Sequence, residues 1–515
     1  MPRFLTEERH FEPIGSKTTN QRCCGNTCRP RLAATVVLGM ILTAFLVLEA
    51  FIPLRTAVQI GADEGFELAK ATLCLTGHHL YTEVWNDQPP LHTFVLTQAF
   101  HLSRSVLVAR LMTVIFSMAL LRAVFLIAFR VSGLLVAGLT TALVIASPGF
   151  LELSSSCMLE IPALATALVG IWVASAYRGA LSKVLAGVIF GLSLQMKLVP
   201  AIYLVIIALV VYFQHQGERA WLKHLANDLA VFGIAMVFVY IASDFWIDRG
   251  AYLGNLQQAW ASHFGPARSS EYGSPNDHPF RWSVLLKNWD ITVLASIGAA
   301  VFVRRVRTLP VSVVPLAWLS LTFVVFGIHK PWWPYYYIHT AIPLCWCAGL
   351  GAVSLWERFR GRRAILTFLA MVGLGAISWM GARVFLEVSN LRRLPQTYSS
   401  PVIGQLKRFK PFTDWLYADQ LAYSFYSGIP IVPSVAVLPV KRMWSGEMTN
   451  AKLAAELAKY KPGLILLRND GRGVPFDGLL VSQYQIVYMD PDNRLYALRT
   501  IAKKERWQGS SGEVK

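Results

Sequence analysis

LAATVVLGMILTAFLVLEAF, residues 32–51, is followed closely by GADEGFELAK, residues 61–70. The first stretch is apolar over the roughly 20 residues that a helix needs to cross a bilayer. The second places Asp63, Glu64 and Glu67 just beyond the end of that helix, where carboxylates cost free energy unless they are solvated or used. Together they predict a membrane protein that keeps a functional acidic group at the surface of the bilayer.

The composition extends this interpretation to the whole chain. Of the 515 residues, 54% are hydrophobic and 15% are charged, and the mean hydropathy is +0.45. These values are typical of polytopic membrane proteins and rare in soluble ones. The net charge is +18, but the basic residues fall between apolar runs. They are therefore interpreted as determinants of membrane topology rather than as a nucleic-acid site.

The apolar runs predict an α-helical polytopic membrane protein with about 11–13 transmembrane helices. The individual spans are placed at 32–52, 107–129, 133–148, 161–178, 182–196, 198–214, 225–246, 286–303, 311–328, 336–356 and 364–385. A cytoplasmic N-terminal segment, 1–31, precedes the first span and leaves it as an uncleaved anchor. This orientation puts the Arg and Lys clusters of the short loops on the cytoplasmic side, as the positive-inside rule requires.

Four segments then lie on the outer side of the membrane, at 53–106, 149–160, 247–285 and 386–515. In the first of them, 64–75 has the apolar spacing of an interfacial helix, and 91–102 is an apolar stretch too short to span the bilayer. The last contains β-like runs and one helical run, so 386–500 is predicted to be a small extracytoplasmic α/β domain. These runs are 464–467, 484–489 and 494–498, with the helix at 450–460. The basic tail, 501–515, is predicted to be disordered.

The cysteines do not define a metal site. The run CCGNTC at 23–28 has no second Cys or His pair to complete a ligand set, and Cys345 and Cys347 lie in an apolar run as expected for buried thiols. No metal ligands are assigned anywhere in the chain, and a divalent metal is left open as a cofactor.

Polar residues gather on the outer side, at the ends of several predicted spans. They are Asp63, Glu64, Asp87, Glu160, Lys197, His263, Arg268 and the run HKPWWPYYYIH at 329–339. Each has a structural alternative: Asp63 as a helix cap, Lys197 as a snorkelling span end, and 329–339 as an interfacial belt. Carboxylates, cations and aromatic rings on one face would also serve a site for an anionic lipid and a polar acceptor.

The order of several short motifs resembles the GT-C superfamily of integral membrane glycosyltransferases. The motifs are ADEG at 62–65, WNDQPPL at 85–91, RL at 110–111, SP…LE at 147–160, GLSLQMKLVP at 191–200 and HKPWWPYYYIHTAIP at 329–343. The similarity covers about 30–385. It is greatest to the protein O-mannosyltransferase and lipid A aminoarabinose transferase group, with its bacterial relatives that glycosylate lipopolysaccharide. The resemblance implies a GT-C fold, with 32–385 as the transmembrane glycosyltransferase domain.

The resemblance also implies a reaction. A sugar would move from a polyprenyl-phosphate donor to a hydroxyl of a lipid, glycan or protein acceptor on the extracytoplasmic face, in one inverting displacement. Asp63 matches the acidic residue that carries the chemistry in the family, and Glu160 matches a second acidic position that orients acceptor or base. An attacking hydroxyl needs a carboxylate to accept its proton, and the departing phosphate needs cations. Lys197 matches the family's lysine after a Gly-Leu-rich span and is expected to contact the phosphate.

Further residues are assigned to the site on the basis of less specific motifs. Arg268, Lys330, Tyr337 and His339 are added as donor-phosphate contacts, Asp87, Gln88 and His263 as other substrate contacts, and Glu64 as the alternative catalytic acid. One departure stands out, because relatives usually have a lysine before the Pro-Pro pair and this chain has Gln88. An amide can donate a hydrogen bond but carries no charge.

Two other classes of protein remain as alternatives. A transporter or flippase of lipid-linked sugars would usually show repeat symmetry and ionisable residues in mid-span. No repeat is evident here, and the charged exceptions inside predicted spans are Glu49, Arg122, Asp228 and Asp244. A non-catalytic scaffold would leave the carboxylate–lysine pattern unexplained. An enzyme in a bacterial plasma (inner) membrane, with a polyprenyl-phosphate lipid and a membrane acceptor as partners and no nucleic acid, is the expectation.

Overall fold

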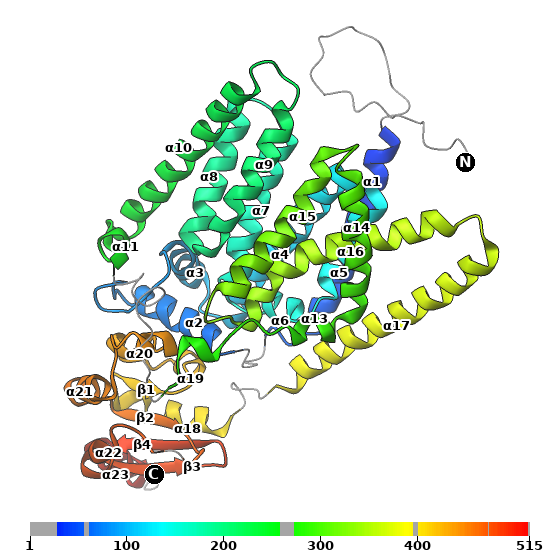
Figure 1. Ribbon diagram of the computed structural model, residues 1–515. Coiled ribbons are helices and arrows are strands. Elements are labelled where there is room, and N and C mark those ends of the chain that lie inside the picture. The colour runs from blue at the N-terminus through cyan, green and yellow to red at the C-terminus, as the bar shows by residue number, and fades with distance from the viewer. Residues whose placement is uncertain (1–27, 56–60, 258–271, 395–399, 472, 513–515) are drawn as a thin grey trace.

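The computed structural model of the protein describes residues 28–55, 61–257, 272–394, 400–471 and 473–512. A large helical bundle fills most of the molecule, and a small domain with a β-sheet lies at one end of it (Figure 1). The N-terminal cysteine run, 23–28, lies outside the described residues apart from the backbone of Cys28.

Six helices in the described part of the chain are long and apolar enough to cross a membrane. They are α1 (Cys28–Ala50), α4 (Val106–Ser132), α10 (Trp221–Asp248), α15 (Val313–Ile328) with its preceding turn, α16 (Tyr337–Phe359) with its preceding turn, and α17 (Arg363–Arg393). Shorter apolar helices are α5 (Leu134–Ile145), α7 (Glu160–Ala176), α8 (Ala180–Met196) and α9 (Leu204–His215) with its preceding turn. The remaining predicted span, 286–303, corresponds to α14 (Trp289–Arg305), which follows the short α13 (Ser283–Lys287). The chain is an integral membrane protein.

Helices α14 and α16 pack against each other at very close range, because each helix has a glycine where the two backbones meet. A Cβ atom on Gly298 would overlap the carbonyl oxygen of Cys347, and one on Gly351 would overlap that of Leu294. Small residues at such crossings let helix backbones approach without a side chain between them. Cys347 is buried there with Cys345, and both thiols are free, as the sequence predicted.

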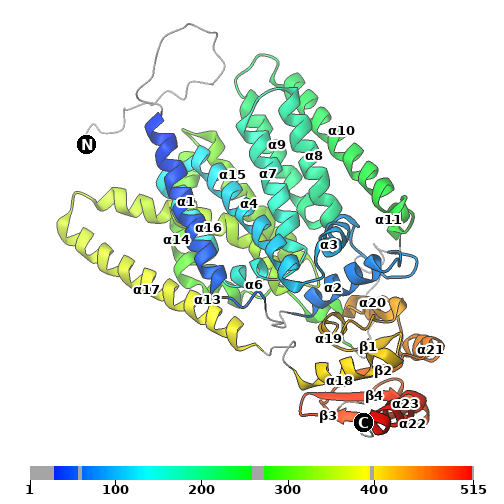
Figure 2. The ribbon, with the colours of Figure 1, turned by 180° about the vertical axis from the view of Figure 1, so that it is seen from behind.

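Three short helices lie between the bundle and the small domain, as the two opposite views show (Figures 1 and 2). Helix α2 (Gly61–Leu75) and helix α3 (Leu91–Leu102) match the predicted interfacial helix and the second short apolar stretch. Helix α6 (Phe150–Ser154) belongs to the second predicted outer segment. Helix α2 carries Asp63 and Glu64, which the sequence singles out, so the candidate site lies at this end of the bundle.

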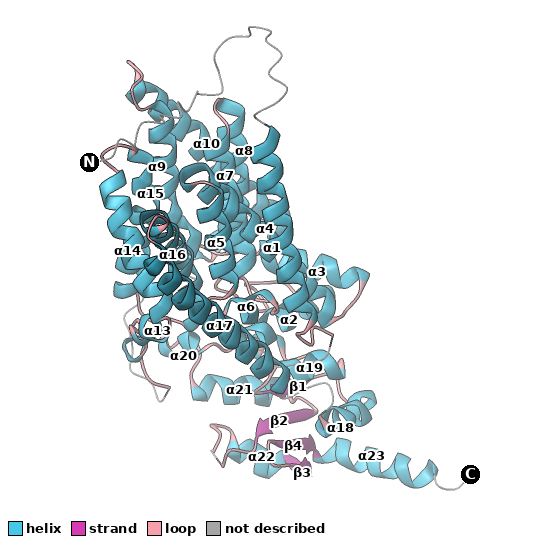
Figure 3. Cartoon of the chain, turned by 90° about the vertical axis from the view of Figure 1, so that its right-hand side faces the viewer, coloured by secondary structure: helices cyan, strands magenta, loops and turns pink. Residues whose placement is uncertain are grey.

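The small domain is built on a four-stranded sheet of order β1-β2-β4-β3 (Figure 3). Strand β1 (Leu416–Ala418) runs parallel to β2 (Leu464–Arg468), whereas β4 (Asn493–Leu498) is antiparallel to β2 and to β3 (Tyr484–Met489). The predicted runs at 464–467, 484–489 and 494–498 are thus confirmed, and helix α21 (Asn450–Tyr460) has the predicted bounds. Only β1 was missed, because a strand of 3 residues gives no alternating pattern.

Further helices surround this sheet. They are α18 (Pro401–Phe409), α19 (Ala422–Ser427), α20 (Val440–Trp444), α22 (Asp477–Gln483) and α23 (Arg499–Gly512). The short α20 belongs to the part of the domain that lies nearest α2 (Figure 1).

Two predicted boundaries differ from the structure. Helix α17 continues to Arg393 instead of ending at 385, so the sheet domain begins at about residue 400 rather than at 386. The tail 501–515, predicted to be disordered, forms α23 up to Gly512. Contacts on one face of this helix explain why it forms. Ala502 is buried in the core of the domain, and Glu505, one turn later on the same face, forms an ion pair with Arg408 of α18.

Candidate active site

Asp63 lies at the start of α2, at the end of the bundle that faces the sheet domain. It lies in the first turn of the helix, where the helix dipole favours a negative charge. Its side chain lines a cavity of about 440 Å³. The other walls come from α6 and its preceding turn, from α13, and from the aromatic run before α16.

The residues that line this cavity with Asp63 are Pro148, Gly149, Glu152, Leu153, Met158, Val284, Trp332, Pro334, Tyr335, Tyr337 and Ile338. An adjoining cavity of about 450 Å³ lies between α6 and α17 and shares Pro148, Gly149 and Glu152 with the first.

Glu160 and Lys197, which the sequence assigned separately, form an ion pair. Glu160 begins α7 and Lys197 directly follows α8, so the ends of two helices bring them together. Both side chains are buried, and the ammonium of Lys197 lies 5.1 Å and 5.2 Å from the ring centroids of Tyr335 and Tyr336. These cation–π contacts and the ion pair hold the ammonium of Lys197 at a fixed place.

The same charges act on Asp63. Burial raises the pKa of the Asp63 carboxyl above its usual range, and repulsion from Glu160 raises it further, whereas Lys441 and Lys197 lower it. Asp63 is therefore within electrostatic reach of both cations and of the second carboxylate. A carboxylate with a raised pKa is a stronger base than an ordinary one, which suits it to accept a proton from a hydroxyl near neutral pH.

Lys441 was missed by the sequence analysis. It lies on α20 of the sheet domain and forms an ion pair with Asp87 of the WNDQPP motif. The amide of Gln88 donates a hydrogen bond of 3.0 Å to the same carboxylate. The motif itself is held by Tyr81 and Asn86, which donate hydrogen bonds of 2.7 Å and 2.8 Å to the carbonyl of Gln88. A cation from a distant part of the chain thus lies next to the position where relatives usually carry a lysine.

Other residues of α20 also contact the membrane domain. The guanidinium of Arg442 lies 5.1 Å above the ring of Trp85, and the ring of Trp444 stacks on Trp333 with 6.4 Å between centroids. The sheet domain therefore packs against the segment between α1 and α4, which carries Asp63 and Asp87.

Glu64 has a different environment from Asp63. Arg110 of α4 donates two hydrogen bonds to it, from Nε at 2.8 Å and from Nη2 at 2.9 Å, and the backbone N–H of Cys157 donates a third at 3.1 Å. The side chains of Glu64 and Arg110 are only 5% and 0% exposed. Both carboxylate oxygens of Glu64 are thus occupied in joining α2 to α4, which argues against Glu64 as the catalytic acid.

A second buried ion pair supports the same region. Glu67 lies 2.7 Å from Lys70 and 3.2 Å from the Nδ1 atom of His92 in α3. Lys70 in turn donates a hydrogen bond of 3.1 Å to Asn86 in the WNDQPP motif. Acidic residues of GADEGFELAK therefore serve two purposes: Glu64 and Glu67 fix the helix, and Asp63 faces the cavity.

Three residues of the run 329–339 were predicted to contact the donor phosphate, and they lie in three different environments. Tyr337 lines the cavity, and its hydroxyl accepts a 3.5 Å contact from the amide of Asn288. His339 points into the bundle, where its Nδ1 lies 2.6 Å from the hydroxyl of Tyr203 and its ring packs on Phe326. Lys330 is exposed.

Two further site predictions are not tested by the structure. His263 and Arg268 lie outside the described residues. Within the described ranges, three potential metal ligands converge at one place, formed by His215, Glu218 and His224, and not around Asp63.

The similarity of this protein to known proteins is found in its structure and not in its sequence. No protein-family model and no curated protein matches this sequence. The solved structure of ArnT from Cupriavidus metallidurans in the apo state is similar, with a TM-score of 0.66 at 14% identity over 91% of this chain and 99% of that one. ArnT from the same organism bound to undecaprenyl phosphate gives a TM-score of 0.60 at 14% identity, with the same coverage.

A second enzyme has the same architecture. The apo oligosaccharyltransferase of Archaeoglobus fulgidus gives a TM-score of 0.53 at 12% identity, covering 84% of this chain and 69% of that one. At identities this low the similarity concerns the fold. The protein thus has the fold of the GT-C membrane glycosyltransferases, as the order of its motifs predicted.

Proposed function

We propose that the protein is a membrane glycosyltransferase that moves a sugar from a polyprenyl-phosphate donor to a hydroxyl of a lipid, glycan or protein acceptor. The observation that carries the proposal is Asp63, a carboxyl at a cavity with Lys197 and Lys441 nearby. The GT-C fold supports it, because the similar ArnT structure is bound to undecaprenyl phosphate. The reaction would take place on the extracytoplasmic face of a bacterial plasma membrane.

The proposed reaction is a single displacement at C1 of the donor sugar. The acceptor oxygen forms a bond to C1 of the sugar while the bond from C1 to the phosphate oxygen breaks, and the configuration at C1 inverts. Asp63 takes the proton of the acceptor hydroxyl, and the lipid phosphate leaves with the electron pair. Lys197 and Lys441 compensate the charge that develops on the phosphate, as preorganised cations do in other transfer reactions.

Glu160 acts as a positioning residue in this scheme. In the structure it neutralises Lys197 and repels the negative charge of Asp63. A donor phosphate would share Lys197 with Glu160, so the lysine need not be desolvated alone before the donor arrives. Glu160 would also keep the pKa of Asp63 raised while the acceptor binds.

The test is Asp63→Asn in the purified full-length enzyme, with a radiolabelled polyprenyl-phosphate sugar and a membrane acceptor. Loss of a general base typically lowers the rate about 10²–10⁴-fold. Donor binding, measured separately, should be retained because Asn keeps the size and the hydrogen-bonding capacity of Asp. Glu83→Gln is the matched control: it neutralises a carboxylate in the same outer segment, 46% exposed and away from the cavity.

Full transfer activity in Asp63→Asn would contradict the mechanism. A flippase, the alternative function, would move the labelled donor across a vesicle membrane without releasing its sugar. Measuring both release and translocation with one labelled lipid therefore separates the two functions.

A further inference from the structure

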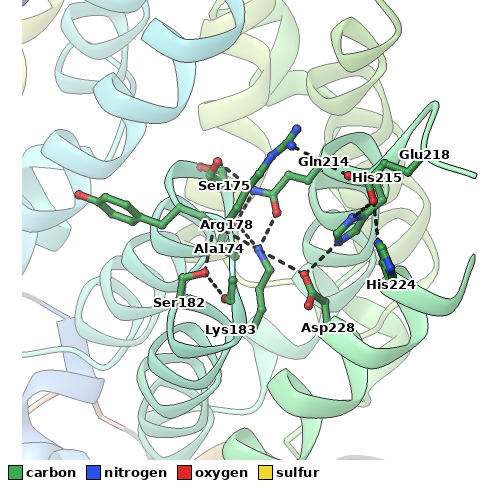
Figure 4. A network of polar contacts seen from close by, with 12 residues as sticks. Ala174, Ser175, Arg178, Ser182, Lys183, Gln214, His215, Glu218, His224 and Asp228 are labelled. Carbon is green, nitrogen blue, oxygen red and sulfur yellow. Dashed lines mark hydrogen bonds and ion pairs between the residues drawn. The ribbon is translucent and has the colours of Figure 1, made fainter. Parts of the chain in front are cut away.

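A second cluster of ionisable side chains lies at the end of the bundle opposite to Asp63. Figure 1 shows the loop between α9 and α10 at that end, and Figure 4 shows its side chains. The Nδ1 atoms of His215 and His224 lie 3.0 Å and 2.7 Å from the same oxygen, Oε2 of Glu218. One ligand atom from each of the three residues lies within 4.8 Å of the other two.

We propose that His215, Glu218 and His224 bind a divalent transition-metal ion of the Zn²⁺ class. Two imidazole nitrogens and one carboxylate oxygen are a ligand set that Zn²⁺ prefers, with bonds of about 2.0–2.2 Å. Ligand atoms around a tetrahedral ion with such bonds are about 3.4 Å apart. The two N···O distances here, 2.7 Å and 3.0 Å, would need to open by less than an ångström.

Asp228 orients the first histidine for this role. Its Oδ2 atom lies 3.0 Å from Nε2 of His215 (Figure 4). If His215 donates its Nε2 proton to Asp228, the lone pair of Nδ1 faces Glu218 and the proposed ion. Metal-binding histidines commonly have such a carboxylate behind them, which fixes the tautomer and raises the basicity of the ligand.

Asp228 is itself held by a buried lysine. The ammonium of Lys183, fully buried at the start of α8, lies 3.9 Å from Asp228. It donates hydrogen bonds of 2.6 Å to Oε1 of Gln214 and of 2.9 Å to the carbonyl of Ala174. Residues of α7, α8 and α9 thus surround Lys183, which holds Asp228 of α10 in place, and with it the ring of His215.

The two nitrogens of His215 face different carboxylates, Nδ1 toward Glu218 and Nε2 toward Asp228, and His224 contacts the same Glu218 oxygen. An ion between the two Nδ1 atoms and Glu218 would use one nitrogen of His215 as a ligand and leave the other to donate to Asp228. Three protein ligands leave a fourth position for water, and the half-exposed side chain of His224 leaves the ion accessible to solvent.

The site would fasten the α9–α10 hairpin and take no part in sugar transfer. Its test uses the full-length protein purified with a tag that contains no histidine. After removal of loosely bound metal with a chelator and titration with Zn²⁺, wild type should bind one ion per chain at this site by mass spectrometry of the metal. Glu218→Gln and His224→Ala should lose that ion, and His101→Ala, an exposed histidine of α3, should keep it.

Asp228→Asn should keep the ligands and weaken Zn²⁺ binding by about 10–100-fold, as loss of such a supporting group does. Co²⁺ in place of Zn²⁺ should give tetrahedral d–d absorption without a thiolate charge-transfer band. Retention of the ion in a variant with Ser at Cys23, Cys24 and Cys28 would agree with the proposal. Equal Zn²⁺ content in wild type and Glu218→Gln, or no bound ion in wild type, would overturn it in favour of a hydrogen-bonded cluster.

Discussion

The ion pair between Glu64 and Arg110 predicts that two adjacent carboxylates respond in opposite ways to neutralisation. Glu64→Gln removes the charge of the carboxylate to which the guanidinium of Arg110 donates at 2.8 Å and 2.9 Å, and the side chain of Arg110 is 0% exposed. Breaking a buried pair by removing one partner costs about 3–5 kcal/mol of folding free energy. At about 1.4 kcal/mol per factor of ten, the unfolded fraction should rise by roughly two to four orders of magnitude.

Asp63→Asn changes the same charge one residue away and should not destabilise the protein. The pKa of Asp63 is raised by burial, so its anion is less favourable in the folded protein than in the unfolded one. Removing that anion at neutral pH should leave the melting temperature unchanged or slightly higher, because a carboxyl with a raised folded pKa opposes folding above that pKa. Stability and activity should therefore separate: Glu64→Gln loses stability and Asp63→Asn loses transfer.

The assay is the fraction of protein that remains monodisperse after heating in detergent, measured for both variants and wild type. A second variant, Glu64→Gln with Arg110→Met, removes both charges and keeps an acceptor for the N–H of Cys157. It should recover most of the lost stability, because an ion pair replaced as a unit costs little. A Glu64→Gln protein that melts like wild type but cannot transfer sugar would refute the reasoning and make Glu64 the base.

Three further predictions concern the site and its orientation. The proposed mechanism needs the carboxylate form of Asp63, whose pKa is raised above 3.8. The rate should therefore begin to fall above pH 3.8 as the pH decreases, and an acid limb at or below that value in a pH–rate profile would contradict this. Lys441→Ala should weaken donor binding by about 2 kcal/mol, or about 30-fold, in a lipid-binding assay. The same variant should shift the acid limb upward, since Lys441 lowers the pKa of Asp63, and an unshifted limb would remove Lys441 from the site. A phosphatase fused at Gly471 should be active and one fused at Arg360 inactive, and the reverse result would invert the proposed topology.

Local sequence signals predicted a large part of this architecture. Helix α21 and three of the four strands followed from periodicity, and Glu160 and Lys197, assigned from separate motifs, form one ion pair. The role of Arg110 was not apparent, although its motif was noted, because a sequence does not show which carboxylate a buried arginine meets. Lys441 could not be predicted, since its contact with Asp87 depends on how two domains pack and has no local pattern.

The contacts of α20 divide the proposed site between two folded units. Lys441, Arg442 and Trp444 belong to the sheet domain, while their partners Asp87, Trp85 and Trp333 belong to the membrane domain. Beneath these polar contacts the two units share a buried hydrophobic core, in which Ala69 and Leu73 of α2 pack with Leu421 and Tyr423 of the sheet domain. Lys441 is therefore held next to Asp87 by an interface that resembles the interior of a single domain. A membrane domain produced without the sheet domain would keep Asp63 and Lys197, but it would lack one of the two proposed cations and would leave this apolar surface in water.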